Sequence, residues 1–139
     1  MDPSELPLWL AIDGIRERDP RYAREAYVFV VAALGATVQG LPAERLDDPL
    51  QRHLSGGELM EGIVRLARSE FGTLAPTVFE EWGVRTGEDV GHIVFDLVEG
   101  GQLSARPEDT LDDFRRGPEL LRALALPSRT ASASQAGDG

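Results

Sequence analysis

The chain has 139 residues, of which 42% are hydrophobic and 27% are charged, and this composition is typical of one globular domain rather than of a disordered chain. It contains no cysteine, which excludes a disulfide framework, a thiolate metal site and a cysteine nucleophile. All fourteen basic residues are arginine and the net charge is −10, so the chain should repel nucleic acid and anionic lipid.

The N-terminal residues do not form the pattern of a secretory signal. They are acidic where such a signal is basic, and Pro7 and Asp13 interrupt their apolar run. The longest apolar run, residues 26–34, has about half of the ~20 residues that span a bilayer. We therefore expect a cytoplasmic protein without a membrane anchor.

The first predicted helix runs from a cap at Ser4 to about Arg18, because the Asp19-Pro20 pair cannot continue it. Its buried stripe should consist of Leu8, Trp9, Ile12 and Ile15. A cluster of arginines gathers around the break, formed by Arg16, Arg18, Arg21 and Arg24. Acidic residues are interleaved with this cluster, which favours a solvated mixed-charge surface over an anion-contact site.

The second predicted helix covers residues 23–39, which are apolar on nearly every face, as expected of a helix at the centre of a core. Gly40 ends it, and Gly35 is a candidate for a close helix crossing. The β-branched run at residues 27–31 leaves a strand as the alternative. Residues 41–52 then form a connecting loop with room for one helical turn.

The sequence of Ser55 followed by Glu58 predicts a capping box, in which each side chain bonds the backbone amide of the other. It starts a helix that Gly72 ends. The predicted core face of this helix comprises Leu59, Met60, Ile63, Val64, Leu66 and Phe71.

Two more helices are predicted before residue 100. Thr73 is expected to cap the first, and Gly83 to end it. Its core face should consist of Leu74, Val78, Phe79 and Trp82. Thr86 with Asp89 repeats the capping box for the second, whose predicted core residues are Val90, Ile93, Val94, Leu97 and Val98.

Residues 102–114 have two interpretations: a small hairpin with Pro107 in its turn, or a further helical turn that starts at Thr110. A last helix is predicted over residues 119–126.

The predicted fold is therefore mainly α, a compact domain of five to six helices over residues 1–127 with at most a small β-hairpin. Residues 128–139 are small and polar and are expected to form a disordered tail. The three central helices have a helix-turn-helix-like outline, which a hairpin would extend to a winged helix. The third of them would then be the recognition helix, yet it carries four carboxylates and no arginine. This charge disfavours a DNA-binding role.

Few residues are candidates for chemistry. His92 is spaced to pair with Asp89 or Asp96 on one helix, and a metal site would also need His53 to meet His92. A structural histidine is the favoured interpretation, so we expect no metal, no cofactor and no catalytic residue. A phosphate-binding loop is excluded because its motif requires a lysine. The predicted interaction surface comprises Glu88, Asp89, His92, Asp96 and Glu99.

Several short segments together resemble a small family of conserved hypothetical bacterial proteins, typical of Planctomycetes, Verrucomicrobia and their relatives. They are RYA (21–23), EAY (25–27), FV (29–30), HLSG (53–56), EL (58–59), Gly62, FG (71–72), EWGV (81–84), IVF (93–95), LVE (97–99), Leu103 and DDF (112–114). The resemblance covers about residues 8–114 and is specific as a set. It implies a shared fold over this span and carries no activity with it.

The favoured function is a non-catalytic cytoplasmic protein-interaction or regulatory module, acting in a larger complex or as a homo-oligomer. The alternative is a winged-helix nucleic-acid-binding protein. An enzyme of unknown class ranks third and would require His53, His92 or Tyr27 to meet carboxylates in a pocket.

Overall fold

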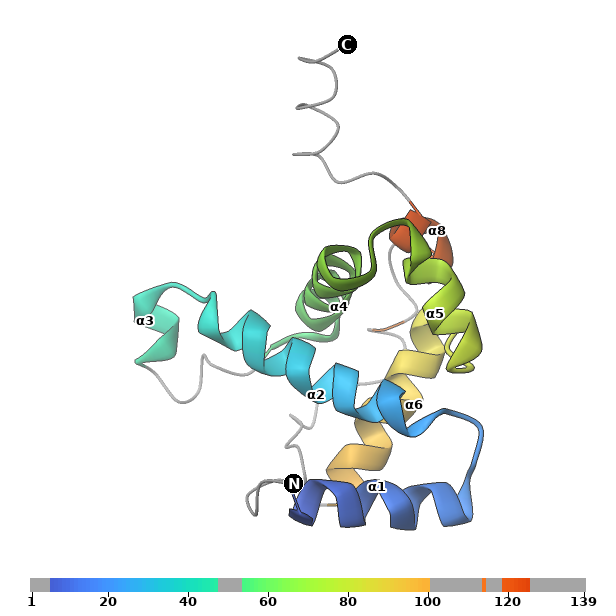
Figure 1. Cartoon of the computed structure of the whole chain (residues 1–139). Helices are drawn as coiled ribbons and strands as arrows, with labels where there is room; N and C mark the ends of the chain where they lie inside the picture. The colour runs from blue at the N-terminus through green and yellow to red at the C-terminus, as the bar shows by residue number, and fades with distance from the viewer. Residues whose placement is uncertain (1–5, 48–53, 101–113, 115–118, 126–139) are drawn as a thin grey trace.

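The computed structural model describes residues 6–47, 54–100, 114 and 119–125, and these residues form a helical fold without a strand (Figure 1). The helices are α1 (Leu6–Arg18), α2 (Arg24–Gln39), α3 (Ala43–Leu46), α4 (Gly56–Phe71), α5 (Ala75–Glu81), α6 (Gly87–Glu99) and α8 (Leu120–Ala125), with the 3-10 helix η2 at Gly72–Leu74. The predicted mainly α class is confirmed, and the strand alternative for residues 27–31 is wrong because they lie inside α2.

Both predicted capping boxes are present. At the start of α4, the Ser55 hydroxyl accepts from the Glu58 amide at 3.1 Å, and the Glu58 carboxylate accepts from the Ser55 amide at 2.9 Å. At the start of α6, the amide of Asp89 donates to the Thr86 hydroxyl, and the amide of Thr86 donates to the Asp89 carboxylate, both at 3.1 Å. Each box satisfies backbone donors that have no partner inside the helix.

The core lies where α2 and α4 meet the other helices. In Figure 1, α2 passes between α1 and α4, and α6 lies behind it. Contacts join α2 to α1, α4 and α6, and join α4 to α5, α6 and α8. The largest fully buried side chains are Tyr22, Tyr27, Ile12, Ile15, Ile63, Ile93, Leu97, Leu120, Leu124, Val84 and Val90. Half of the predicted stripe of α1 and most of that of α6 are therefore buried, while Leu8, Trp9 and Val98 are partly exposed.

Helices α2 and α4 approach each other closely at Gly62, where a Cβ atom would overlap the Thr37 hydroxyl and lie 3.0 Å from the Thr37 Cβ. Only a residue without a side chain allows this approach. The prediction that Gly35 makes the close crossing is wrong, because a Cβ at Gly35 would meet nothing within 4 Å.

The prediction for α5 is wrong in two respects. Thr73 does not cap it but lies within η2, and α5 begins at Ala75 without a side-chain cap. Leu74, predicted to be in the core, is 62% exposed. The residues that α5 buries are Ala75 and Phe79, on the side that contacts α4 and α8.

A tight turn at Gly83 connects α5 to the segment before α6. Gly83 has a φ of +84°, which favours glycine, and a Cβ there would lie 2.5 Å from the carbonyl oxygen of Arg21. Beside it, the Ala23 amide donates to the Trp82 carbonyl at 3.0 Å. The α1–α2 loop is thereby fixed against the α5–α6 turn.

Several predictions fall wholly or partly outside the described residues, among them the cap at Ser4. The hairpin alternative concerns residues 102–114, of which only Phe114 is described, and that residue is helical and buried. The helix-turn-helix-like centre and its winged-helix form are not confirmed. The predicted tail over residues 128–139 also lies outside the described residues. None of the described helices is long and apolar enough to cross a membrane.

Candidate functional site

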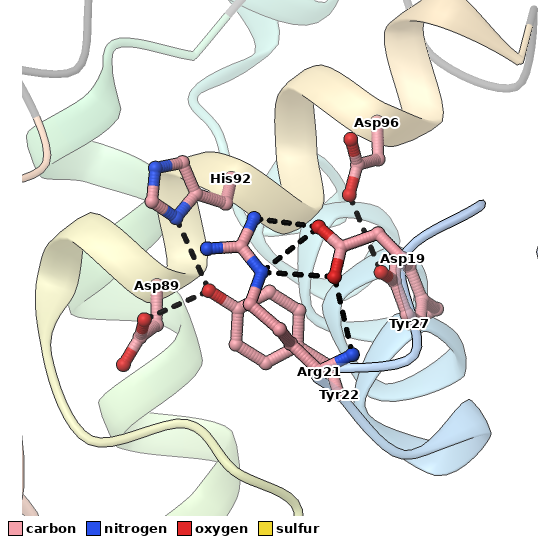
Figure 2. Close-up of polar contacts among 7 residues, drawn as sticks. All are labelled: Asp19, Arg21, Tyr22, Tyr27, Asp89, His92 and Asp96. Carbon is pink, nitrogen blue, oxygen red and sulfur yellow. Dashed lines mark hydrogen bonds and ion pairs between the residues drawn. The ribbon is translucent and has the colours of Figure 1, made fainter. Parts of the chain in front are cut away.

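A cluster of polar side chains joins the α1–α2 loop and α2 to α6 (Figure 2). The hydroxyl of Tyr22 donates to the Asp89 carboxylate at 2.8 Å and lies 3.1 Å from Nδ1 of His92. A tyrosine hydroxyl has one proton, and Tyr22 uses it in the hydrogen bond that it donates to Asp89. The His92 Nδ1 must therefore carry a hydrogen and donate it to the Tyr22 oxygen. The three side chains form a directed chain from His92 through Tyr22 to Asp89.

A second pair lies beside the first in Figure 2, where the Tyr27 hydroxyl donates to Asp96 at 3.3 Å. The rings of Tyr22 and Tyr27 pack edge to face, with centroids 6.3 Å apart. Over them, Arg21 forms an ion pair with Asp19 at 2.7 Å, and its guanidinium lies 5.3 Å from the centre of the Tyr22 ring. The cluster thus combines two buried phenols with an exposed ion pair.

The two carboxyl groups on α6 differ in pKa. Burial alone would raise the pKa of Asp89, but hydrogen bonds from the Arg85 amide, Tyr22 and Thr86 outweigh burial and lower it. Burial raises the pKa of Asp96, and its one hydrogen bond from Tyr27 does not compensate. Asp89 is therefore held in its ionised form, while the site of Asp96 opposes ionisation.

Both tyrosines hold their protons firmly. Burial raises the pKa of Tyr22 and of Tyr27 above the ordinary tyrosine value, and the carboxylate that accepts from each hydroxyl raises it further. Neither phenol is thus prepared to act as a base or nucleophile at neutral pH. In the described part of the chain, no three His, Asp or Glu side chains gather closely enough to hold a metal ion. The hydrogen bonds instead fix the α1–α2 loop on α6.

The predicted interaction surface on α6 divides into two groups. Asp89, His92 and Asp96 face the two tyrosines, as Figure 2 shows, and are only partly exposed. Glu88 is also partly exposed, and Glu99 is exposed near the end of the helix. Much of this predicted surface is therefore used for internal contacts. His53 lies outside the described residues, so its predicted relation to His92 stays a prediction.

Three of the four predicted anion-contact arginines bond to other groups of the chain. Arg16 donates to the Tyr22 carbonyl at 3.0 Å, and Arg21 pairs with Asp19. Arg24 pairs with Asp13 at 2.7 Å and lies 5.0 Å over the centre of the Trp9 ring. Arg18 is exposed at the end of α1.

A second candidate site is an apolar strip formed by Phe71, Leu74, Val78 and Trp82. Leu74, Val78 and Trp82 are spaced four apart, so they lie along one side of α5. The Phe71 ring at the end of α4 packs against the Trp82 ring, with centroids 5.7 Å apart. Leu74 is 62% exposed, and the other three are partly exposed. The sequence pattern assigned these four residues to the core together with Phe79, and of the five only Phe79 is buried.

Aromatic rings support the apolar strip from beneath. The Trp82 ring centre lies 5.3 to 5.7 Å from the ring centres of Phe29, Phe71 and Phe79. Phe29 and Phe79 are buried. The exposed edges of Phe71 and Trp82 are therefore held in fixed positions by the core.

Charged residues border the apolar strip. A hollow of about 420 Å³ lies on α5 and the turn that follows it, and it is lined by Thr77, Glu80, Glu81 and Arg85. A larger groove of about 470 Å³ lies between α2 and α4, over the Gly62 crossing. One carboxylate of this groove, Glu58, already pairs with Arg45 and caps Ser55.

No protein-family model, curated protein or solved structure matches the chain. The resemblance to a bacterial family therefore stays a prediction.

Proposed function

We propose that the chain is a non-catalytic cytoplasmic protein-interaction module that binds its partner through the apolar strip. The observation that carries the proposal is the exposure of Leu74 in line with three further apolar side chains over a buried aromatic cluster. One exposed leucine is ordinary on a protein surface, whereas an aligned row of large apolar side chains is typical of a binding surface.

The aromatic residues strengthen this proposal. Trp82 and Phe71 are rigid side chains whose positions the core already fixes, so little conformational entropy is lost when a partner covers them. Tryptophan is among the residues that contribute most to protein–protein affinity. Asp89 and three arginines of the predicted anion-contact cluster make contacts inside the chain. Fewer groups are therefore available for catalysis or phosphate binding.

A matched pair of variants tests the proposal. Leu10 on α1 is 69% exposed and Leu74 is 62% exposed, so Leu10→Asp makes the same chemical change at a similar exposure outside the apolar strip. In affinity capture from the native cytoplasm, we expect the Leu74→Asp variant to lose the partner by about tenfold or more. The Leu10→Asp variant should retain it. Equal capture by both variants would contradict the proposal.

Nucleic-acid binding is the alternative, and the same material tests it. The α6 carboxylates Asp89 and Asp96 and the net charge of −10 predict no retention on DNA, even at low ionic strength. The alternative would be favoured if DNA retained the chain, if added salt reduced this retention, and if the Leu74→Asp change did not affect it.

A further inference from the structure

We infer that the segment bound at the apolar strip is an amphipathic α-helix of another protein, with basic residues along one flank. This inference rests on the proposed function. It concerns the shape and the charge of the partner.

The shape follows from the apolar strip itself. From Leu74 to Trp82 is eight residues, or about 12 Å along a helix at 1.5 Å per residue. An extended peptide binds well where it can pair with an open sheet edge, but the described residues contain no strand. The backbone of α5 is bonded within the helix, so binding must come from side chains. A narrow apolar row then fits the apolar stripe of another helix.

The charge follows from the border of the apolar strip. Glu81 lies beside Leu74 and Val78 on the helical surface, because it is seven residues after one and three after the other. Glu80 and Glu81 are both exposed, and no ion pair joins either to a cation in the described part of the chain. Arg85 lines the same hollow, but no ion pair joins it to either glutamate in the described part of the chain. A basic flank on the partner would supply the missing countercharges.

A second copy of this chain fits the apolar strip less well. Each copy has a net charge of −10, and a two-fold interface would bring the acidic border of each apolar strip toward the other. The same field attracts a basic partner over several ångströms and increases its association rate at low salt.

Synthetic helical peptides without aromatic residues provide the probe. Three peptides share one leucine stripe and carry arginine, glutamine or glutamate along the flank. The chain has two tryptophans, so a Trp9→Phe background leaves the emission of Trp82 as the signal of binding. We expect the arginine peptide to bind about tenfold more tightly than the glutamine peptide at low ionic strength, and the difference to shrink as salt is added.

Two charge reversals test the border. Glu81→Arg should lower the affinity for the arginine peptide several-fold, because like charges then meet at the flank. The same change should raise the affinity for the glutamate peptide, because opposite charges then meet. Glu61→Arg makes the same change at an exposed position on α4 outside the apolar strip and should leave the preference unchanged. Equal effects of both reversals would show that net charge alone decides binding and would overturn the inference.

The remaining outcomes separate the inference from the proposed function. If glutamine and arginine peptides bind equally and Leu74→Asp abolishes both, the proposed function stands and the inference of a basic partner fails. If Leu74→Asp changes no peptide's binding, both fail. If the free protein sediments as a dimer that Leu74→Asp dissociates, the occupant is a second copy and the inference is overturned.

Discussion

Tyr22 is the residue that connects the most distant parts of the described sequence through polar contacts. Its hydroxyl bonds to Asp89 and His92, which lie 67 and 70 residues further along the chain. In Tyr22→Phe the ring is retained, but Asp89 loses a donor and His92 loses its acceptor. We expect a loss of about 1–2 kcal/mol in the free energy of unfolding, measured by urea denaturation.

Tyr27→Phe is the matched control for this prediction. The Tyr27 hydroxyl makes a single hydrogen bond of 3.3 Å, which is longer than the 2.8 Å bond of Tyr22 to Asp89. Its removal should cost clearly less. Equal losses in the two variants would contradict the role assigned to the Tyr22 hydroxyl.

Asp96→Asn should stabilise the protein near neutral pH. Burial raises the pKa of Asp96, so the folded state binds its proton more tightly than the unfolded state does. Folding is therefore opposed increasingly as pH rises above the unfolded pKa, and the full cost is present above the folded pKa. Asparagine removes this cost while its side-chain oxygen still accepts from Tyr27. The melting temperature of the variant should exceed that of the wild type near neutral pH. The gain should disappear at about pH 3.

Asp89→Asn should have the opposite sign. The pKa of Asp89 is lowered, so its ionised form contributes stability above the unfolded pKa, and this contribution is lost as pH falls through the folded pKa. The variant should melt below the wild type near neutral pH, and the two should converge in acid. The same direction of change in both variants would refute the assignment of the two carboxyl groups.

At the scale of whole elements, the contact between α2 and α4 depends on one missing side chain. Gly62→Ala should cost about 1–3 kcal/mol because its Cβ overlaps the Thr37 side chain. Adding Thr37→Ala should restore part of the loss, since it removes the overlapping hydroxyl but leaves a Cβ nearby. Denaturant titration of the two single variants and the double variant measures this rescue.

Gly35→Ala is the control for the helix crossing. A Cβ at Gly35 meets nothing within 4 Å, so alanine should add up to about 1 kcal/mol by its higher helix propensity. If Gly35→Ala lowered the free energy of unfolding as much as Gly62→Ala does, the space around each glycine and the helix propensity of alanine would not explain the stability of these variants.

The elements differ in how far the sequence predicts them. Ser55 and Thr86 cap helices through partners three residues away, so local sequence contains the whole interaction. The buried face of α5 depends instead on which helices pack against it. Helical spacing is shared by two sets of residues, the row from Leu74 to Trp82 and the pair Ala75 and Phe79. Contact with α4 and α8 buries Ala75 and Phe79.

The candidate sites show the same division. The predicted α6 residues Asp89 and His92 do belong to a polar cluster, but the sequence has no local signal that Tyr22 completes it. Long-range contacts of this kind are set by the tertiary fold. Leu74, Val78 and Trp82 have helical spacing in the sequence, but the exposure of Leu74 depends on which helices pack against α5.

For the molecule as a whole, charge repulsion should outweigh the attraction of its ion pairs. The net charge is −10, while the side chains of the ion pair between Arg24 and Asp13 are 45% and 47% exposed and contribute little. Added sodium chloride should therefore raise the melting temperature by screening repulsion. The rise should be smaller in a Glu17→Gln, Glu25→Gln double variant, and a fall in melting temperature would contradict the prediction.

The turn at Gly83 limits how this sequence can change over time. Any other residue would have to adopt a φ of +84° and also displace the Arg21 carbonyl, which lies 2.5 Å from the position of a Cβ. Two independent obstacles leave no single compensating substitution. A library randomised at position 83 and selected for folded protein should return glycine almost alone, while one randomised at position 35 should return many residues. The sequence alone therefore does not show which glycines can be replaced: position 35 should accept other residues, and position 83 should not.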